Sequence, residues 1–185
     1  MDADFNNIKK GTLLLAEPFM QDEHFKRSVV LICEHNTEGT IGLILNKPTI
    51  FKVNQMVGNF PHINAFIHSG GPVENDRLNY IHVYHDIIPN AFQIEDNIYW
   101  NGDFDVLKEQ IKLKHIMPQN IMFFSGYAAW DFEQLKAEVE EQSWIICNID
   151  YPIFKTSEYM WKDILQKMGG KYKLIAEYPE NPNLN

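Results

Sequence analysis

Two histidines, His82 and His85, stand three positions apart and are followed by Asp86, so this stretch contains residue types that bind metal ions. Successive side chains of a β-strand alternate between its two faces, and a spacing of three therefore sends the two imidazole rings to opposite faces. The chain also contains no His-Glu-x-x-His and no Cys-x-x-Cys motif, which would indicate a zinc site. The pattern favours aromatic surface positions for these histidines, and we predict no metal and no cofactor.

Glu34 and His35 are adjacent, and a carboxylate beside an imidazole is a candidate general acid–base pair. Adjacent side chains of a strand diverge, however, so solvation at a turn is the favoured interpretation. Polar residues nevertheless gather in three loops at predicted strand ends, residues 17–27, 34–36 and 46–47. Because sheet proteins commonly carry their functional groups in such loops, this surface is the candidate site.

Ser69 stands directly before Gly70 and Gly71, as a nucleophile does in a tight turn. The Gly-x-Ser-x-Gly motif requires a glycine two positions before the serine, where this chain has Ile67. The glycine pair also lacks the Gly-Lys-Ser/Thr ending of a phosphate-binding loop. The pair therefore predicts a structural turn that uses backbone conformations denied to other residues.

The leading prediction is a non-enzymatic binding or regulatory protein that acts through a protein partner, because polar groups are concentrated without a completed reaction centre. A second prediction is a small-molecule-binding or hydrolytic enzyme that uses Glu34, His35 and Asn46. In that enzyme, the turn amides of Gly70 and Gly71 would bind an anion. A third is a nucleic-acid-binding regulator. The candidate binding residues are Glu34, His35, Asn46, Lys47, Gly70, Gly71 and Trp130.

The acidic composition argues against nucleic acid as the partner. The formal net charge is -9 and the pI is near 5.2, so the overall field repels a phosphate backbone. Four lysines between residues 162 and 173 are interleaved with acidic residues such as Glu158, Asp163 and Glu177. This pattern indicates a solvated helix face instead of a basic patch.

Cys33 and Cys147 each end an apolar run, which predicts two reduced, buried thiols. Residues 1–10 carry acidic groups and lack the hydrophobic segment of a signal peptide. No stretch reaches the roughly 18 uninterrupted apolar residues that a membrane span needs. The sequence therefore predicts neither export nor membrane insertion, and we expect a cytoplasmic protein.

Three apolar runs must position the candidate residues, and they cover residues 12–16, 28–33 and 40–45. Their apolar positions are consecutive instead of alternating, which predicts strands covered on both faces. The link between the second and third runs is short and polar and ends in Gly39, so these two strands are predicted to form a hairpin. Between the first two strands, residues 20–26 are predicted to form one helical turn.

The rest of the chain alternates short strands with helices. Further strands are predicted at residues 65–68, 78–84, 98–100, 120–125 and 144–147, and helices over residues 53–60, from Asp103, from Asp131 and from about residue 157 to Gly169. Asp103 and Asp131 are predicted N-caps, and Gln134 has the reciprocal capping-box position of the second. Residues 179–185 are predicted to form an extended tail.

A series of motifs runs through the whole chain in a fixed order. It comprises Gly11-Thr12-Leu13-Leu14-Leu15-Ala16 with Pro18, Asp22 and Phe25; Glu34-His35-Asn36 with Gly39, Gly42 and Leu43; Asn46-Lys47-Pro48; Gly70-Gly71-Pro72-Val73; Phe123-Phe124 with Gly126-Tyr127; Trp130, Gln134-Leu135 and Trp144; and Pro182 with Leu184-Asn185. The series resembles the YqgE/AlgH family of bacterial proteins. The resemblance implies an α/β protein with a mixed sheet, flanking helices and a larger and a smaller lobe, and it implies no enzyme activity. The AlgH name reflects a proposed regulatory role in exopolysaccharide synthesis.

Length and composition complete the prediction of the fold. A chain of 185 residues with 45% hydrophobic and 22% charged residues suits one globular domain without a disulfide or metal staple. We predict the α/β (α+β) class, with a mixed, largely antiparallel sheet and helices packed on it. The prediction treats residues 1–185 as a single domain and allows for a smaller second lobe.

Overall fold

The computed structural model of the protein describes residues 5–147 and 149–179. Within these residues ten strands form one sheet, against which the helices pack. The strands are β1 Leu13–Ala16, β2 Val29–Asn36, β3 Gly39–Ile44, β4 Pro48–Lys52, β5 Phe66–Ser69, β6 Val73–His82, β7 Phe92–Glu95, β8 Ile98–Trp100, β9 Ile121–Trp130 and β10 Trp144–Cys147. The α-helices are α1 Val53–Met56, α2 Phe104–Lys112, α3 Phe132–Glu140, α4 Met160–Met168 and α5 Lys171–Ala176, with short 3-10 turns at Phe5–Asn7 and Pro118–Asn120.

The strand order is β10-β1-β2-β3-β9-β6-β8-β7, with β5 beside β9 and β4 beside β5. The β5–β9 pair is parallel and the other pairs are antiparallel. This arrangement confirms the predicted α+β fold with a mixed, largely antiparallel sheet. In the part of the chain that the structure describes, no helix is long and apolar enough to cross a membrane.

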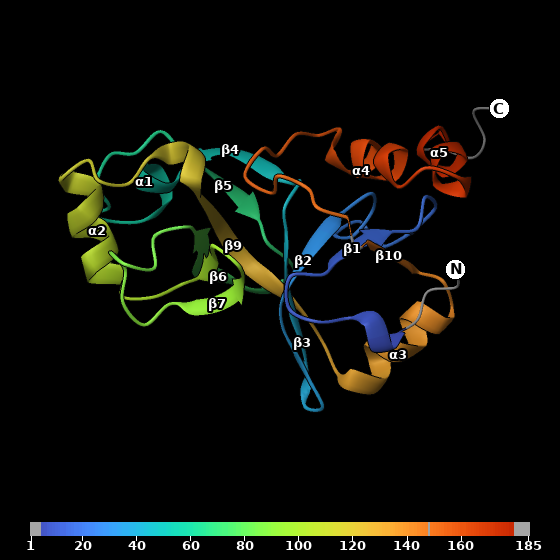
Figure 1. Ribbon diagram of the computed structural model, residues 1–185. Coiled ribbons are helices and arrows are strands. Elements are labelled where there is room, and N and C mark those ends of the chain that lie inside the picture. Colours follow the sequence, from blue (N-terminus) through green and yellow to red (C-terminus); the bar gives the residue numbers. More distant parts are fainter. Residues whose placement is uncertain (1–4, 148, 180–185) are drawn as a thin grey trace.

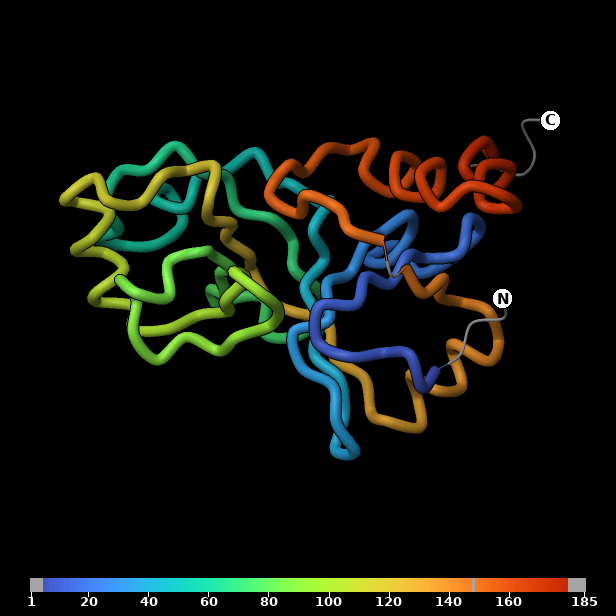
Figure 2. The backbone as a smooth tube through the Cα atoms, viewed as in Figure 1, coloured from blue at the N-terminus to red at the C-terminus, as the bar shows by residue number. Residues whose placement is uncertain are grey.

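The long strand β9 joins two lobes of the molecule. Its first half lies between β5 and β6, whereas residues 128–130 pair with β3. Figure 1 shows β10, β1 and β2 with α3, α4 and α5 on one side of this strand, and β6, β7, α1 and α2 on the other. The backbone path in Figure 2 shows that one continuous stretch, from β4 to the first half of β9, builds the second lobe.

Both faces of the first lobe's sheet are covered. Along β1, Leu13 and Leu15 pack in one cluster with Trp161 of α4. Leu14 and Ala16 point to the opposite face and pack in another cluster with residues of α3. Figure 1 shows α4 and α5 on one side of these strands and α3 on the other. The prediction from the consecutive apolar runs, that these strands are covered on both faces, is therefore confirmed.

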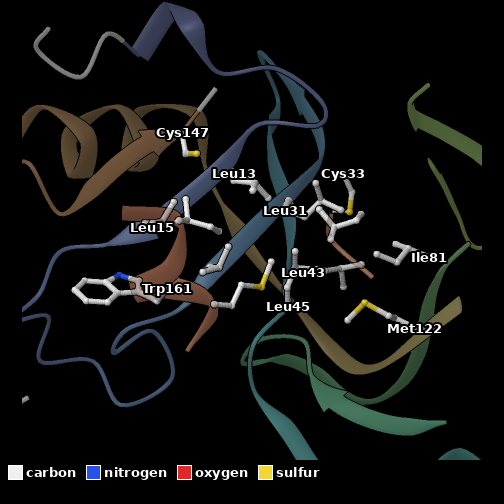
Figure 3. Close-up of a cluster of buried hydrophobic side chains, with 14 of the residues drawn as sticks. Leu13, Leu15, Leu31, Cys33, Leu43, Leu45, Ile81, Met122, Cys147 and Trp161 are labelled. Carbon is white, nitrogen blue, oxygen red and sulfur yellow. Dashed lines mark hydrogen bonds between the residues drawn. The ribbon is translucent and has the colours of Figure 1, made fainter. Parts of the chain in front are cut away.

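The second lobe has a core of its own and shares another with the first lobe. Phe123 of β9 packs with Leu107 and Ile111, which are the inward residues of α2. On the other face of the β6–β9 pair, Ile81 and Met122 join the cluster that contains the β1 and β2 leucines. Figure 3 shows both side chains directed at that cluster. The shared core fixes the second lobe against the first.

The two predicted helix caps have different outcomes. The carboxylate of Asp103 accepts two backbone N–H groups from the first turn of α2, as predicted. Asp131 precedes α3 but makes no side-chain cap hydrogen bond. The Gln134 amide donates to the Glu138 carboxylate instead of reaching back to the cap, with an N···O distance of 2.9 Å. The predicted capping box is therefore wrong, although the inward positions Leu135 and Val139 are buried as the pattern indicates.

Several elements differ from their prediction. Residues 20–26 contain turns and no helix. The strands β4 and β7 and the helix α5 were not predicted. β9 continues to Trp130 because Gly126, at a φ of 70°, lets the strand pass a bend that other residues would resist. Apart from Pro179, the predicted tail at residues 179–185 lies outside the described residues.

Candidate functional site

Asn46 and Lys47 hold a loop in place. The Asn46 side chain is 6% exposed. Its Oδ1 accepts from the backbone N–H of Val29 at 2.8 Å, and its Nδ2 donates to the carbonyl of Arg27 at 2.9 Å. The Lys47 ammonium donates to the carbonyl of Lys26 at 2.7 Å. Both side chains therefore use hydrogen-bonding groups to fix the end of the 17–27 loop against β3.

Glu34 and His35 lie near the opposite end of β2. The His35 Nδ1 is 2.7 Å from the Thr40 hydroxyl on β3. Its ring packs against the rings of Phe5 and Phe132, which also contact each other, and burial lowers the pKa of the imidazole. Glu34 is exposed and accepts a hydrogen bond from the side chain of its neighbour Asn36, at 3.0 Å.

The predicted polar residues do not converge into one site. Asn46 is bonded to Val29, and His35 lies six residues further along the same strand, which corresponds to about 20 Å at the rise of a β-strand. The second predicted function required Glu34, His35 and Asn46 to line one pocket. Because that distance exceeds hydrogen-bond reach many times over, these residues do not form a joint catalytic centre.

Gly70 and Gly71 lie where β3, β5 and β9 meet. The Gly70 N–H donates to the carbonyl of Ser125, and the Gly70 carbonyl accepts from the N–H of Ile44. A Cβ atom on Gly70 would lie 2.4 Å from the Gly126 carbonyl oxygen, and one on Gly71 would lie 2.2 Å from the Tyr127 carbonyl carbon. The pair is a structural turn, as predicted, and the Gly70 amide already has a partner.

Trp130 belongs to an aromatic cluster beneath α3. Its indole N–H donates to Glu138 at 3.0 Å, and the indole of Trp144 donates to the same carboxylate oxygen at 2.7 Å. Phe25 packs against both indole rings. Several residues of the sequence motifs thus serve one structural arrangement around Glu138, namely Phe25, Trp130, Gln134 and Trp144.

Two of the predicted residues line a common groove. The acidic groove, as we call it, has a volume of about 360 Å³ and lies beside the β2–β3 hairpin. Glu34 and Trp130 contribute to its wall, together with the carboxylates of Glu38 and Asp131. The lining contains no lysine or arginine among the described residues. A ligand of this groove would therefore carry positive charge.

The two histidines that invited a metal have separate environments. His82 is fully buried, so the predicted surface position is wrong for this residue. His85 is half-exposed, and its Nε2 lies 3.0 Å from Oδ1 of Asp86. The Nε2 of His82 is 2.8 Å from the Asn101 carbonyl, and its Nδ1 accepts from the N–H of Tyr84 at 3.1 Å. These contacts define a neutral imidazole with the proton on Nε2, in agreement with a pKa lowered by burial.

No metal site is assembled in the part of the chain that the structure describes, where no group of three or more His, Cys, Asp or Glu side chains could hold an ion. Cys33 and Cys147 are free and buried, as predicted. Burial raises the pKa of both thiols. Both cysteines are therefore assigned to the hydrophobic core.

Sequence reasoning missed an exposed apolar surface on the second lobe. We call it the β4–α1–β5 face and define it as Ile50 and Phe51 of β4, Met56 of α1 and Phe66 of β5. Ile50 is 82% exposed and Met56 is 58% exposed, and the two phenylalanines are each 46% exposed. Among the described residues β4 pairs with β5 alone, so the face lies at an edge of the sheet. The elements that carry these side chains are neighbours in the fold, and large exposed apolar side chains on neighbouring elements often mark an interaction surface.

One signal in the sequence could have indicated this face. Asp and Glu make up 25 of the 185 residues, yet no carboxylate occurs from Gly39 to Val73. The same stretch contains Lys47 and Lys52. The face therefore belongs to a stretch without acidic residues in an otherwise acidic chain, and the sequence alone shows this stretch.

Comparisons with known proteins agree with the fold. The profile of a family described as AlgH-like matches residues 13–173. A UPF0301 protein of Chlorobaculum parvum is 41% identical over the full length of both chains, and one of Bacteroides fragilis is 40% identical over 97% of this chain and 94% of its own. The solution structure of the AlgH protein from Pseudomonas aeruginosa is similar, with a TM-score of 0.74 and 24% identity over 97% of this chain and 98% of that one.

A crystal structure of a protein from Corynebacterium diphtheriae is similar to the same degree. Its TM-score is 0.74 at 22% identity, over 96% of this chain and 98% of that one. At such identities the two solved structures support the fold alone. The family profile matches most of the chain, and relatives near 40% identity match over its full length. This chain therefore belongs to the AlgH-like UPF0301 family.

Proposed function

We propose that the protein is a non-enzymatic, regulatory binding protein of the cytoplasm, which works as a single domain and acts through a protein partner. The observation that carries this proposal is the β4–α1–β5 face. The polar residues that suggested a reaction centre make internal hydrogen bonds at separate places, whereas the face presents large apolar side chains to solvent. Apolar side chains of this kind supply the core of protein–protein interfaces.

The backbone of β4 helps to expose the face. Pro48 pairs with His68 and Lys52 pairs with Phe66, so four steps along β4 match only two along β5. The extra residues form a bulge that contains Ile50. The N–H of Phe51 donates to the Thr49 hydroxyl at 3.2 Å. Because the bulge makes this edge irregular, the partner is expected to bind through side-chain packing instead of an added strand.

The charges around the face select the chemistry of the partner. Lys52 lies at the face, and its ammonium is 5.8 Å from the centre of the Phe66 ring. No carboxylate occurs from Gly39 to Val73, while the chain as a whole has a net charge of -9. A second copy of the chain is acidic too, but to bind here it would also have to present an apolar patch that fits the face. The occupant favoured by this charge pattern is a partner segment with apolar residues flanked by Asp or Glu.

Synthetic peptides test this proposal with defined probes. Short fluorescent peptides with two leucines are prepared in two forms, one flanked by glutamate and one by lysine, and their anisotropy is followed as the purified protein is added. We expect the glutamate form to bind at least about tenfold more tightly, equivalent to roughly 1.4 kcal/mol. Ile50→Asp with Met56→Asp should abolish this binding.

The matched control is Leu174→Asp on α5, which changes an exposed leucine, 69% accessible, outside the face. It should bind the glutamate peptide as the unchanged protein does. Equal binding of both peptides, or equal loss in the control, would contradict the proposal. A rise in mass with concentration in sedimentation would assign the face to a second copy, and preferential binding of an oligonucleotide there would assign it to nucleic acid.

The acidic groove is a second candidate partner surface. It contains Glu34 and Trp130 of the predicted set, and His35 lies on the same hairpin. Its carboxylates favour a basic partner segment. In the peptide experiment this groove would prefer the lysine form, and Glu34→Gln would weaken that preference, so the two surfaces give opposite results.

A further inference from the structure

A second cavity lies between the two lobes, away from the β4–α1–β5 face. We call it the interlobe cleft; its volume is about 780 Å³, within the range of small-molecule sites. The N-terminal segment before β1, the β7–β8 hairpin and residues 149–153 line it. Figure 2 shows the N-terminal segment and the hairpin beside each other where the lobes meet.

The cleft has an apolar floor. Leu13 of β1, Leu31 of β2 and Cys147 of β10 contribute to it, and all three are at most 3% exposed. They are neighbours because Leu13 pairs with both Leu31 and Cys147 in the sheet. Figure 3 shows the three side chains on the same side of the strands. Above this floor, the apolar surface that a ligand could cover is presented by the half-buried lining residues Ile98, Ile149 and Tyr151.

The rim of the cleft carries negative charge. Glu95, Asp96 and Asp150 line it and are exposed. Within residues 5–147 and 149–179, none of these three carboxylates makes a side-chain ion pair or hydrogen bond. Lys9 is the one basic residue of the lining in that part of the chain. The local charge is therefore negative, and it favours a cation.

The wall that carries Glu95 is held by contacts with the N-terminal segment. The Lys10 ammonium donates to the carbonyl of Gln93 on β7 at 3.0 Å. Gly11 has a φ of 85°, and a Cβ atom there would lie 3.0 Å from Oε2 of Glu95. Glycine at this position thus permits both the turn of the chain and the approach of the carboxylate. The hairpin and the first lobe are fixed together on this side of the cleft.

The three carboxylates do not form a metal site. In the described part of the chain, no group of three or more His, Cys, Asp or Glu side chains comes close enough to hold an ion. An ammonium group needs only one of these carboxylates, so an organic cation does not require them to converge. We propose that the interlobe cleft binds a small organic cation, a primary amine whose apolar body lies against Ile98, Ile149 and Tyr151 and whose ammonium is bound by one of the rim carboxylates.

Three isosteric probes test this proposal by calorimetry with the purified chain. Phenethylamine has the ammonium and the apolar body, 2-phenylethanol is its neutral analogue, and phenylacetate is its anionic analogue. We expect saturable binding of the amine, at least about tenfold tighter than that of the alcohol, and no binding of the acid. Glu95→Gln with Asp150→Asn should weaken amine binding about tenfold and leave the weak binding of the alcohol unchanged.

The control is Glu133→Gln with Glu140→Gln on α3, which removes the same charge from exposed positions outside the cleft. It should retain amine binding. No saturable binding of the amine, equal affinity for the alcohol, or equal weakening in the control would overturn the proposal. Ile50→Asp with Met56→Asp should bind the amine normally, so this test and the peptide test fail independently.

Discussion

The β2–β3 hairpin and the β4–α1–β5 face are consecutive in the chain and use their side chains in opposite ways. At the hairpin, polar side chains such as Asn46 and His35 bond to neighbouring strands and loops. On the face, Ile50 and Met56 extend into solvent. The hairpin attracted functional predictions because of its residue types, yet its hydrogen-bonding groups are largely occupied within the fold. Exposed apolar side chains without a cover, more than polar residue types, therefore indicate an interaction surface.

Removal of the Asn46 side chain should have the largest effect on stability. Asn46→Ala removes the two hydrogen bonds that its side chain makes, with the buried N–H of Val29 and with the carbonyl of Arg27. We expect a loss of about 2 kcal/mol in the free energy of unfolding, measured by urea denaturation. Binding of the glutamate-flanked peptide should persist at temperatures well below the transition. A stability change near zero, or loss of peptide binding in the folded variant, would show that Asn46 has the role of a surface residue.

The buried His82 should have a smaller effect, which appears in how the free energy of unfolding depends on pH. The pKa of His82 is lowered in the folded protein because the ring is buried, so the unfolded chain binds more protons as the pH falls. The contribution of His82 to stability is complete above the unfolded pKa near 6.5 and is lost as the pH falls from there toward the folded pKa. His82→Gln should therefore flatten the pH dependence of unfolding in that window. An unchanged slope would contradict the account of a buried neutral imidazole.

The order of strands along the sequence was largely predictable, because apolar runs such as residues 12–16 and 28–33 match the observed strands. β4 was missed because it begins at a proline and lies at a sheet edge, where hydrophobic patterning is weak. α5 was missed because Gly169 and Gly170 indicate the end of a helix, and a new short helix begins directly after them. Hydrophobic periodicity indicates which face of a single helix or strand is buried, and it says little about sheet edges or about the start of a short helix directly after another.

The candidate site was less predictable than the fold. Glu34, Asn46 and Trp130 were chosen by residue type, but their roles depend on partners that other strands bring from far along the chain, such as Glu138 for Trp130. The walls of the interlobe cleft likewise come from both lobes. Only the absence of carboxylates from Gly39 to Val73 was available from the sequence as a sign of the β4–α1–β5 face.

The most direct test of the central claim, that the β4–α1–β5 face is the partner surface, is a nuclear magnetic resonance titration. The glutamate-flanked peptide is added to isotope-labelled protein, and shifts of backbone amides are mapped along the chain. Substitutions at Ile50 and Met56 leave the core intact because both side chains are exposed, so stability should change by less than about 0.5 kcal/mol. We predict shifts concentrated at residues 49–57 and 66–68 that vanish in Ile50→Asp with Met56→Asp. Shifts concentrated at residues 34–41 and 129–134 would place binding at the acidic groove and contradict the account.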